Sequence, residues 1–197
     1  MKGFLVALAV IAGIVLTGVF LFSGKYNSMV ALDEKVKEAW SQVENVYQRR
    51  LDLIPNLVST VKGYAAHERQ TLEAVVQARS NISQMKITSD VVNDPEAMAK
   101  FEQAQQGLSG ALSKLLLIVE RYPDLKANQN FLALQTQLEG TENRIAVERR
   151  RFNEVARDFN TKIRVFPDNI VASVFGFKSK AYFQAQETAS VAPKVEF

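Results

Sequence analysis

The sequence predicts an all-α protein: an N-terminal transmembrane helix, then a long antiparallel bundle of three long helices, the first one kinked, and a short C-terminal helix. Two observations predict it. The chain begins with an apolar run, and beyond Tyr26 apolar residues recur at alternating spacings of three and four, as along packed helices. We expect an anchor at residues 1–25, a helical bundle domain at 26–185 and an extended tail at 186–197.

The N-terminal run is long enough to cross a bilayer. It begins at Phe4, ends at Phe22 and holds nineteen uncharged residues, thirteen of them Leu, Ile, Val or Phe. About 20 residues, rising about 1.5 Å each, span the roughly 30 Å of a hydrocarbon core. We therefore expect residues 4–22 to contact membrane lipid as a single-pass anchor.

A cleavable signal peptide is the alternative interpretation of this run. The run exceeds the usual apolar region of about 7 to 15 residues, and no small-x-small cleavage site precedes Lys25, so an anchor is favoured. Lys25, Lys35 and Lys37 follow the run, whereas a single lysine precedes it. By the positive-inside rule this distribution favours a cytoplasmic bundle.

A first long helix is predicted to continue out of the membrane to about residue 82. Pro55 falls inside its pattern and must remove one backbone hydrogen bond, so we expect a kink between Leu51 and Asn56 rather than a break. Its apolar seam consists of Val36, Trp40, Val43, Tyr47, Ile54, Leu57, Val61, Tyr64, Leu72, Val75 and Ile82.

A second long helix is predicted to begin at Asp94 and Pro95, with the aspartate as N-cap and the proline at the first helical position. It should end before Pro123, because a residue that precedes proline avoids the α conformation. The spacing along its seam alternates between three and four residues without exception. The seam consists of Met98, Phe101, Gln105, Leu108, Leu112, Leu115, Val119 and Tyr122.

The last long helix should start near Gln129 and stop at Phe166 and Pro167. A short amphipathic helix is then expected from Asp168 to Phe175, with Gly176 as its cap. The seam of the long helix consists of Leu134, Leu138, Thr141, Ile145, Glu148, Phe152, Val155, Phe159 and Ile163.

Composition excludes several classes of function. Beyond residue 25 the chain is nearly neutral, so it lacks the basic footprint of a nucleic-acid-binding protein, and we expect no nucleic acid partner. There is no cysteine and one histidine, His67, whose neighbour Glu68 would not face it on a helix. We therefore assign no catalytic residue, no metal ligand and no cofactor.

Longer motifs carry a resemblance to a known family. They are AWSQVENVYQRRLDLIPNLVSTVKGYAAHE at residues 39–68, YPDLKANQNF at 122–131 and FPDNIVASVFGF at 166–177, followed by AYF and a final PKVEF. With these motifs in this order the chain resembles the bacterial LemA family over nearly its whole length. The resemblance implies a helical bundle and a protein of the bacterial inner membrane, and it supplies no catalytic residues.

Polar residues interrupt the apolar seams. Because an unpaired buried charge is strongly destabilising, we expect them to pair with one another or to lie where the bundle is open. Specification of helix register is the favoured interpretation, and a surface for a partner or small ligand is the alternative. These residues are Arg50, Glu68, Arg79, Gln105 and Glu148.

Two connections are rich in aromatic residues, proline and asparagine. Packing at the bundle ends would explain this composition, and exposed loop aromatics would also suit the docking of a protein. The candidate partner surface consists of Tyr122, Pro123, Asn128, Phe131, Phe166, Pro167, Phe175 and Phe177.

Three functions compete. The first is a membrane-anchored, non-enzymatic scaffold or adaptor that self-associates or binds a membrane protein through its bundle. The second is a membrane-tethered signalling or sensory module that responds to a ligand or to the state of the envelope. The third is an enzyme, for which the sequence offers no side-chain chemistry.

Overall fold

The computed structural model describes residues 2–85 and 89–184, and within these ranges the chain is helical with no strand. α1 (Lys2–Tyr64) is a single helix of 63 residues that contains Pro55. The sequence prediction that Pro55 would not break the helix is therefore confirmed. α1 carries the apolar run at its start and bundle residues such as Trp40 and Ile54 further along.

The predicted continuation of the first helix to residue 82 was wrong. The chain turns at residues 65–68, where the Glu68 N–H donates to the Ala65 carbonyl at 3.1 Å, and α2 (Arg69–Gln84) follows. The apolar pattern did not reveal the turn, because Leu72 and Val75 return to the same core as Val61. Within residues 2–85 and 89–184 the bundle therefore contains four long helices rather than three.

α3 (Pro95–Val119) follows a short 3-10 helix, η1 (Ser89–Asn93). Its predicted cap is confirmed, since the Asp94 side chain accepts hydrogen bonds from the N–H groups of Glu96 and Ala97 at 2.9 and 3.2 Å. All predicted seam residues of α3 from Met98 to Val119 are buried.

The last long helix and the short helix after it begin where the sequence predicts, whereas a one-turn helix forms at residues 123–126, where no helix was predicted. α4 (Pro123–Lys126) is one turn, and α5 (Gln129–Lys162) is capped by Asn128, whose Oδ1 accepts the Phe131 N–H at 3.0 Å. α6 (Asp168–Phe175) ends at Gly176, which adopts a φ of +73° that side chains rarely tolerate.

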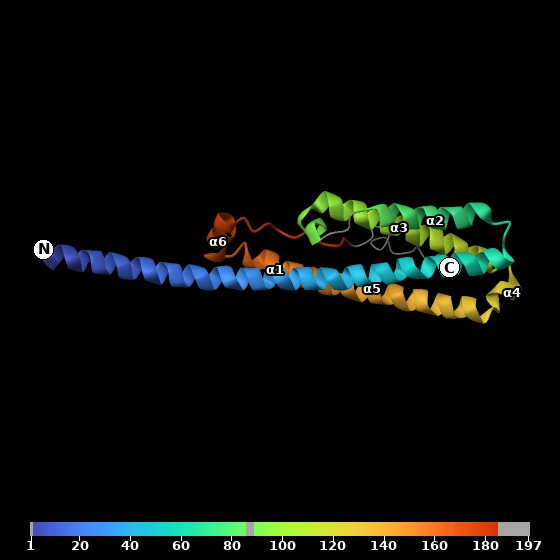
Figure 1. The fold of residues 1–197 in the computed structure, drawn as a ribbon, viewed down its shortest axis with the longest axis horizontal. Helices are drawn as coiled ribbons and strands as arrows, with labels where there is room; N and C mark the ends of the chain where they lie inside the picture. The colour runs from blue at the N-terminus through green and yellow to red at the C-terminus, as the bar shows by residue number, and fades with distance from the viewer. Residues whose placement is uncertain (1, 86–88, 185–197) are drawn as a thin grey trace, which may run out of the picture.

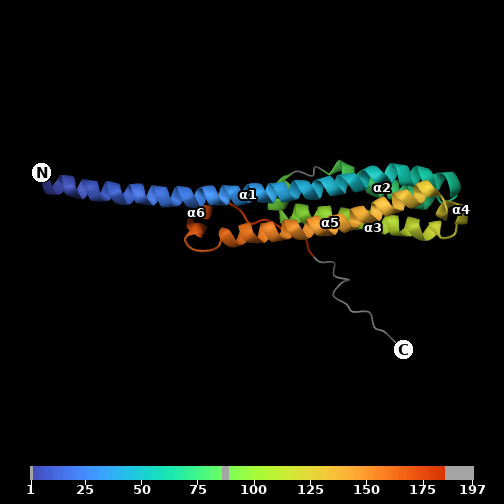
Figure 2. The ribbon, with the colours of Figure 1, turned by 90° about the horizontal axis from the view of Figure 1, so that it is seen from below.

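The four long helices run alternately up and down the bundle, and α1 projects well beyond it at its N-terminal end (Figures 1 and 2). α1 packs mainly on α5, and α2 packs mainly on α3. α6 lies beside α1 at the end of the bundle from which the projection begins (Figures 1 and 2). This arrangement gives the bundle a proximal end, near the apolar run, and a distal end.

The buried apolar side chains of the described residues form two clusters. The proximal cluster is aromatic and includes Trp40, Phe101, Phe152 and Phe159. The distal cluster consists mainly of Leu, Ile and Val side chains of α1, α2 and α3, joined by Leu125 of α4 and by Phe131 and Leu138 of α5. Burial of each large apolar side chain contributes about 1.5–3 kcal/mol, so these clusters account for the apolar positions of the heptad-like pattern.

Residues 177–184, here called the C-terminal strap, follow α6 without helix and return along the bundle to Phe183, which is buried. The predicted extended tail at 186–197 lies outside the described residues.

Candidate functional site

A polar layer separates the two apolar clusters. Arg50 is only 2% exposed, and its NH2 group donates to the Ser109 hydroxyl of α3 at 2.6 Å. Its NH1 group lies 3.5 Å from Gln105 Oε1, and its Nε lies 2.8 Å from Glu142 Oε1 of α5. One side chain thus connects three helices at one level of the bundle.

This layer favours a single register of the helices. Burial lowers the pKa of Arg50, whereas the carboxylate of Glu142 acts in the opposite direction. Sliding any of the three helices would leave a buried guanidinium without its partners, which is strongly unfavourable. The expectation that polar seam residues pair with one another is met by Arg50 and Gln105. Ser109 and Glu142 are partners of Arg50 that the apolar pattern could not identify.

Glu68 and Arg79, two further polar residues of the seams, bind partners outside the polar layer. Glu68 receives hydrogen bonds from Arg121 at 3.0 Å and from the Tyr122 hydroxyl at 3.1 Å. Arg79 donates from Nε to the Leu51 carbonyl at 3.1 Å. Glu148 is half-buried on α5. Glu68 and Arg79 therefore hold separate elements together instead of pairing with each other.

The C-terminal strap is bound by two asparagines of α5. Asn160 accepts the Lys180 N–H at 2.7 Å and donates to the carbonyl of the same residue at 2.9 Å. Asn153 binds the N–H and carbonyl of Phe183 in the same way, both at 2.9 Å. Because the asparagines are about two helical turns apart, they lie on one face and bind an extended chain at two points.

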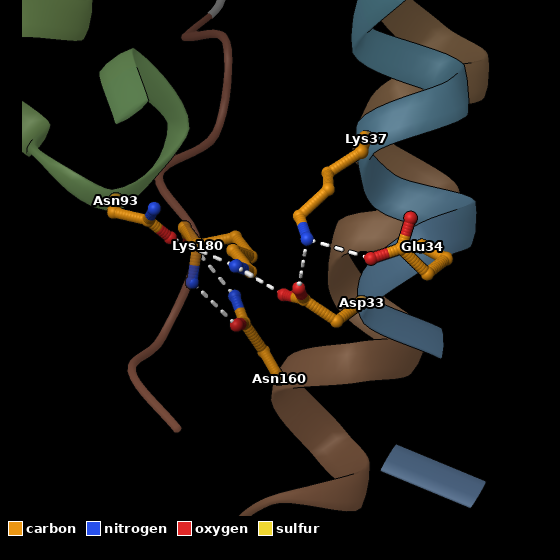
Figure 3. A network of polar contacts seen from close by, with 6 residues as sticks. All are labelled: Asp33, Glu34, Lys37, Asn93, Asn160 and Lys180. Carbon is orange, nitrogen blue, oxygen red and sulfur yellow. Dashed lines mark hydrogen bonds and ion pairs between the residues drawn. The ribbon is translucent and has the colours of Figure 1, made fainter. Parts of the chain in front are cut away.

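The side chain of Lys180 crosses to α1 and η1. Its Nζ lies 2.5 Å from Asp33 Oδ1 and 2.8 Å from Asn93 Oδ1, as Figure 3 shows. Lys37 contacts the same Asp33 at 3.1 Å. Burial acts to raise the pKa of Asp33, but hydrogen bonds and charge from Lys180 and Lys37 outweigh it, so this pKa lies below its usual value.

Phe183 anchors the strap in the proximal cluster. Its ring stacks on Trp40 with centroids 5.9 Å apart and meets Phe152 edge-on at 5.5 Å. The Arg149 guanidinium lies over the Phe183 ring, 4.6 Å from the ring centroid. The strap is therefore part of the core and completes the bundle between α1, α3 and α5.

The first four residues of the candidate partner surface lie at the distal end. Phe131 is 1% exposed, and Tyr122 is half-buried beside Glu68. Asn128 caps α5 and also donates to the Tyr64 hydroxyl at 2.9 Å. Only Pro123 is freely exposed. Three of these four residues therefore pack or form hydrogen bonds at the distal end of the bundle.

The other four residues lie at the proximal end, where more of their surface is exposed. Phe166 is 80% exposed, Phe175 and Pro167 are exposed, and Phe177 is half-buried. Phe175 and Phe177 pack on Tyr26 of α1, with ring centroids 4.6 and 5.9 Å apart. The eight residues thus form two separate groups, one at each end of the bundle.

The proximal group is attached to α1 by charge as well. Asp168 is buried at the start of α6, and its carboxylate lies 3.1 Å from the Nζ atoms of both Lys25 and Lys162. Burial acts to raise the pKa of Asp168, but the hydrogen bonds and charges of the two lysines prevail and hold this pKa below its usual value.

His67 lies exposed in the turn between α1 and α2. Across residues 2–85 and 89–184, no group of three or more His, Cys, Asp or Glu side chains is arranged to hold a metal ion.

Comparison with protein-family models gives a match to the LemA family over residues 39–197. The chain belongs to the LemA family. The resemblance seen in its motifs is thereby confirmed, and the matched region begins in α1 just before Trp40.

Relatives with curated names include two kinds of protein. Protein LemA of Metamycoplasma hominis is 28% identical over 172 residues, which cover 87% of this chain and 74% of the relative. Magnetosome protein MamQ of Magnetospirillum gryphiswaldense is 28% identical over 190 residues, covering 87% and 70% of the two chains. Magnetosome protein MamQ 1 of Paramagnetospirillum magneticum is 27% identical over 194 residues, with the same shares.

The LemA motifs acquire physical roles in this structure. The 39–68 motif supplies Trp40 and Arg50, the 122–131 motif caps α5, and AYF at 181–183 contributes the buried Ala181 and Phe183 of the strap. Sequence reasoning missed Asn153 and Asn160, although their spacing of seven residues on a helix was a signal that they share a face.

Proposed function

We propose that this member of the LemA family is a membrane-anchored, non-enzymatic scaffold that self-associates or binds a membrane protein partner through its bundle. The observation that carries the proposal is the continuity of α1. The same helix of 63 residues contains the exposed apolar run and supplies one wall of both core clusters. A bundle mounted in this way would hold its surfaces at a fixed distance from the bilayer.

The anchor in this proposal is residues 4–22. By length and composition α1 can cross a membrane, and side chains of the run such as Phe4, Leu16 and Phe20 project without contact to the bundle. We propose a single crossing of the bacterial inner membrane with the bundle on the cytoplasmic side. The lysines at positions 25, 35 and 37 support that orientation.

The buried and half-buried polar side chains of the bundle support a structural role. Arg50, Asn153 and Asn160 each bind groups of neighbouring elements, and those contacts join helices and strap. A general acid or base needs a free polar atom within reach of a substrate, and these side chains are already engaged. Their arrangement is suited to a stable binding platform.

A signalling module is the second candidate, and the passage of α1 through Pro55 without a break favours it as well. A continuous helix could transmit a displacement from the membrane to the core. In that case a ligand or a change of the envelope should alter the contacts of the strap, whereas a scaffold keeps them constant.

Site-specific photo-crosslinking in native membranes tests the scaffold proposal. A photoreactive residue is placed at Leu117, Pro123 or Phe166, which are exposed on α3, at the distal end and at the proximal end. The matched control carries it at the buried Ile54. Discrete products from an exposed position, identified by mass spectrometry as a second copy or one membrane protein, are expected.

If none of the three exposed positions gives a crosslinked product and the protein is a monomer in the membrane, the scaffold proposal is contradicted. A product from Ile54 would show that the bundle is not folded under the conditions used.

A further inference from the structure

α6 lies where the apolar run ends. Lys25 follows Phe22 by three residues, roughly 4.5 Å along a helix, and its Nζ lies 3.1 Å from Asp168 at the start of α6. The next residue, Tyr26, packs on Phe175 at the other end of α6. Both ends of α6 are thus attached to α1 at the level where, in the proposed anchoring, the helix leaves the bilayer.

One side of α6 packs on the bundle and the other carries exposed apolar side chains. Val171 and Ala172 are buried, whereas Ile170 and Val174, one turn apart, are exposed. Phe166, in the connection before α6, and Phe175 extend the exposed apolar surface. Contiguous exposed apolar residues of this kind mark interaction surfaces, and short amphipathic helices with aromatic residues are typical of the membrane interface.

The charges around this surface suit an anionic bilayer. Asp168 is the only acidic residue between positions 161 and 184, and it is buried against two lysines. Arg164 and Lys178 flank α6 and are exposed, and within the described residues neither forms an ion pair. Basic side chains beside an apolar surface are attracted to the phosphate groups of anionic lipids.

We propose that α6 and Phe166 form a second membrane contact, in which the exposed apolar side chains enter the headgroup region of the bilayer that the anchor crosses. Arg164 and Lys178 contact the lipid phosphates. The inference rests on the proposed anchoring by residues 4–22. It adds a contact that fixes the tilt and rotation of the bundle, because a rod held at one further point can no longer turn freely about its axis.

The natural lack of cysteine allows a direct test with single-cysteine variants of the full-length chain. Val174→Cys, Leu117→Cys and Leu16→Cys each carry an environment-sensitive fluorophore and are reconstituted into vesicles of phosphatidylethanolamine and phosphatidylglycerol. Val174 and Leu117 are both 71% exposed, so Leu117 on α3 is a matched control away from α6. Leu16 reports whether the anchor is inserted.

The emission of the fluorophore at position 174 should shift to the blue when the protein enters vesicles. Lipids brominated near the headgroup should quench this emission, and the fluorophore at position 117 should show neither change. Replacing phosphatidylglycerol with phosphatidylcholine should weaken the quenching at Val174, as should the double substitution Arg164→Gln and Lys178→Gln. In every case the probe at Leu16 should be quenched by lipids brominated deep in the chain.

A probe at Val174 that stays as accessible to water as the probe at Leu117, while Leu16 is quenched, would overturn the interfacial contact and leave the anchor intact. Failure of quenching at Leu16 would overturn the anchor and the contact together. A shift at Val174 in native membranes but not in pure lipid vesicles would show that a protein covers α6, which also contradicts the proposal.

Discussion

The Nε atom of Arg79 lies 3.1 Å from the carbonyl oxygen of Leu51. In an α-helix this carbonyl would accept the N–H of the residue four positions later, which is Pro55 and has none. A side chain of α2 thus supplies the donor that proline removes from α1. This contact explains how α1 continues through Pro55 and attaches α2 to the same point.

Replacing Arg79 with Met should destabilise the protein by about 1–3 kcal/mol, because the Leu51 carbonyl loses its charged donor. The cost should fall by at least about 0.5 kcal/mol in a Pro55→Ala background, where an N–H is restored. Urea unfolding of the full-length protein in detergent measures both values. Arg144→Met, at an exposed position of α5, is the control and should have little effect. Equal costs in the two backgrounds would disprove the coupling.

The buried charge of Arg50 should depend on Glu142. Glu142→Gln should cost about 1–3 kcal/mol, since it leaves a guanidinium that is 2% exposed with neutral partners only. Glu139→Gln, an exposed change less than one turn away on α5, should be nearly neutral. The measurement is the free energy of unfolding of both variants. Similar values for the two would mean that the ion pair between Arg50 and Glu142 does not contribute to stability.

The strap should detach when its asparagines are changed. Asn160→Asp keeps the acceptor for the Lys180 N–H but loses the donor to its carbonyl, and it adds a negative charge in a buried position. We expect faster proteolysis within residues 177–184 and a loss of about 1–3 kcal/mol. Asn143→Asp, exposed on the same helix, should change neither measurement. Unchanged cleavage in Asn160→Asp would show that the strap is held by other contacts.

Acid should weaken the attachment of α6. The pKa of Asp168 is lowered in the folded state, so its contribution to stability is present above the unfolded value of about 4 and is lost as the pH falls through the folded value. The difference in unfolding free energy between the wild type and Asp168→Asn should therefore be largest near neutral pH and shrink below about pH 4. A difference that is independent of pH would contradict this role of the carboxylate.

Much of the fold could be predicted because helical packing imposes a period on the sequence. The seam of α3 is buried from Met98 to Val119. The helix caps at Asp94 and Gly176 lie at the positions that the residue types predict. The turn after Tyr64 was missed because α2 returns to the same core, so its apolar residues continue the pattern. Periodicity reports which residues are buried and does not report the direction of the chain.

The polar contacts could be predicted only in part. Arg50 and Gln105 stood out because they occupy apolar positions, and they do lie together. The strap has no helical period, and its partners Asn153 and Asn160 lie beside the seam of α5. An extended segment is located by hydrogen bonds to residues distant in sequence, which a local pattern does not contain.

The distance between residues 19 and 45 of α1 tests most directly whether the bundle is rigidly mounted on the anchor. Val19→Cys and Asn45→Cys, both exposed positions, carry spin labels in the full-length protein in lipid nanodiscs. A continuous helix predicts one narrow distribution centred at roughly 39 Å. A broad distribution, or a clearly shorter mean distance, would reveal a hinge between anchor and bundle and would contradict the account.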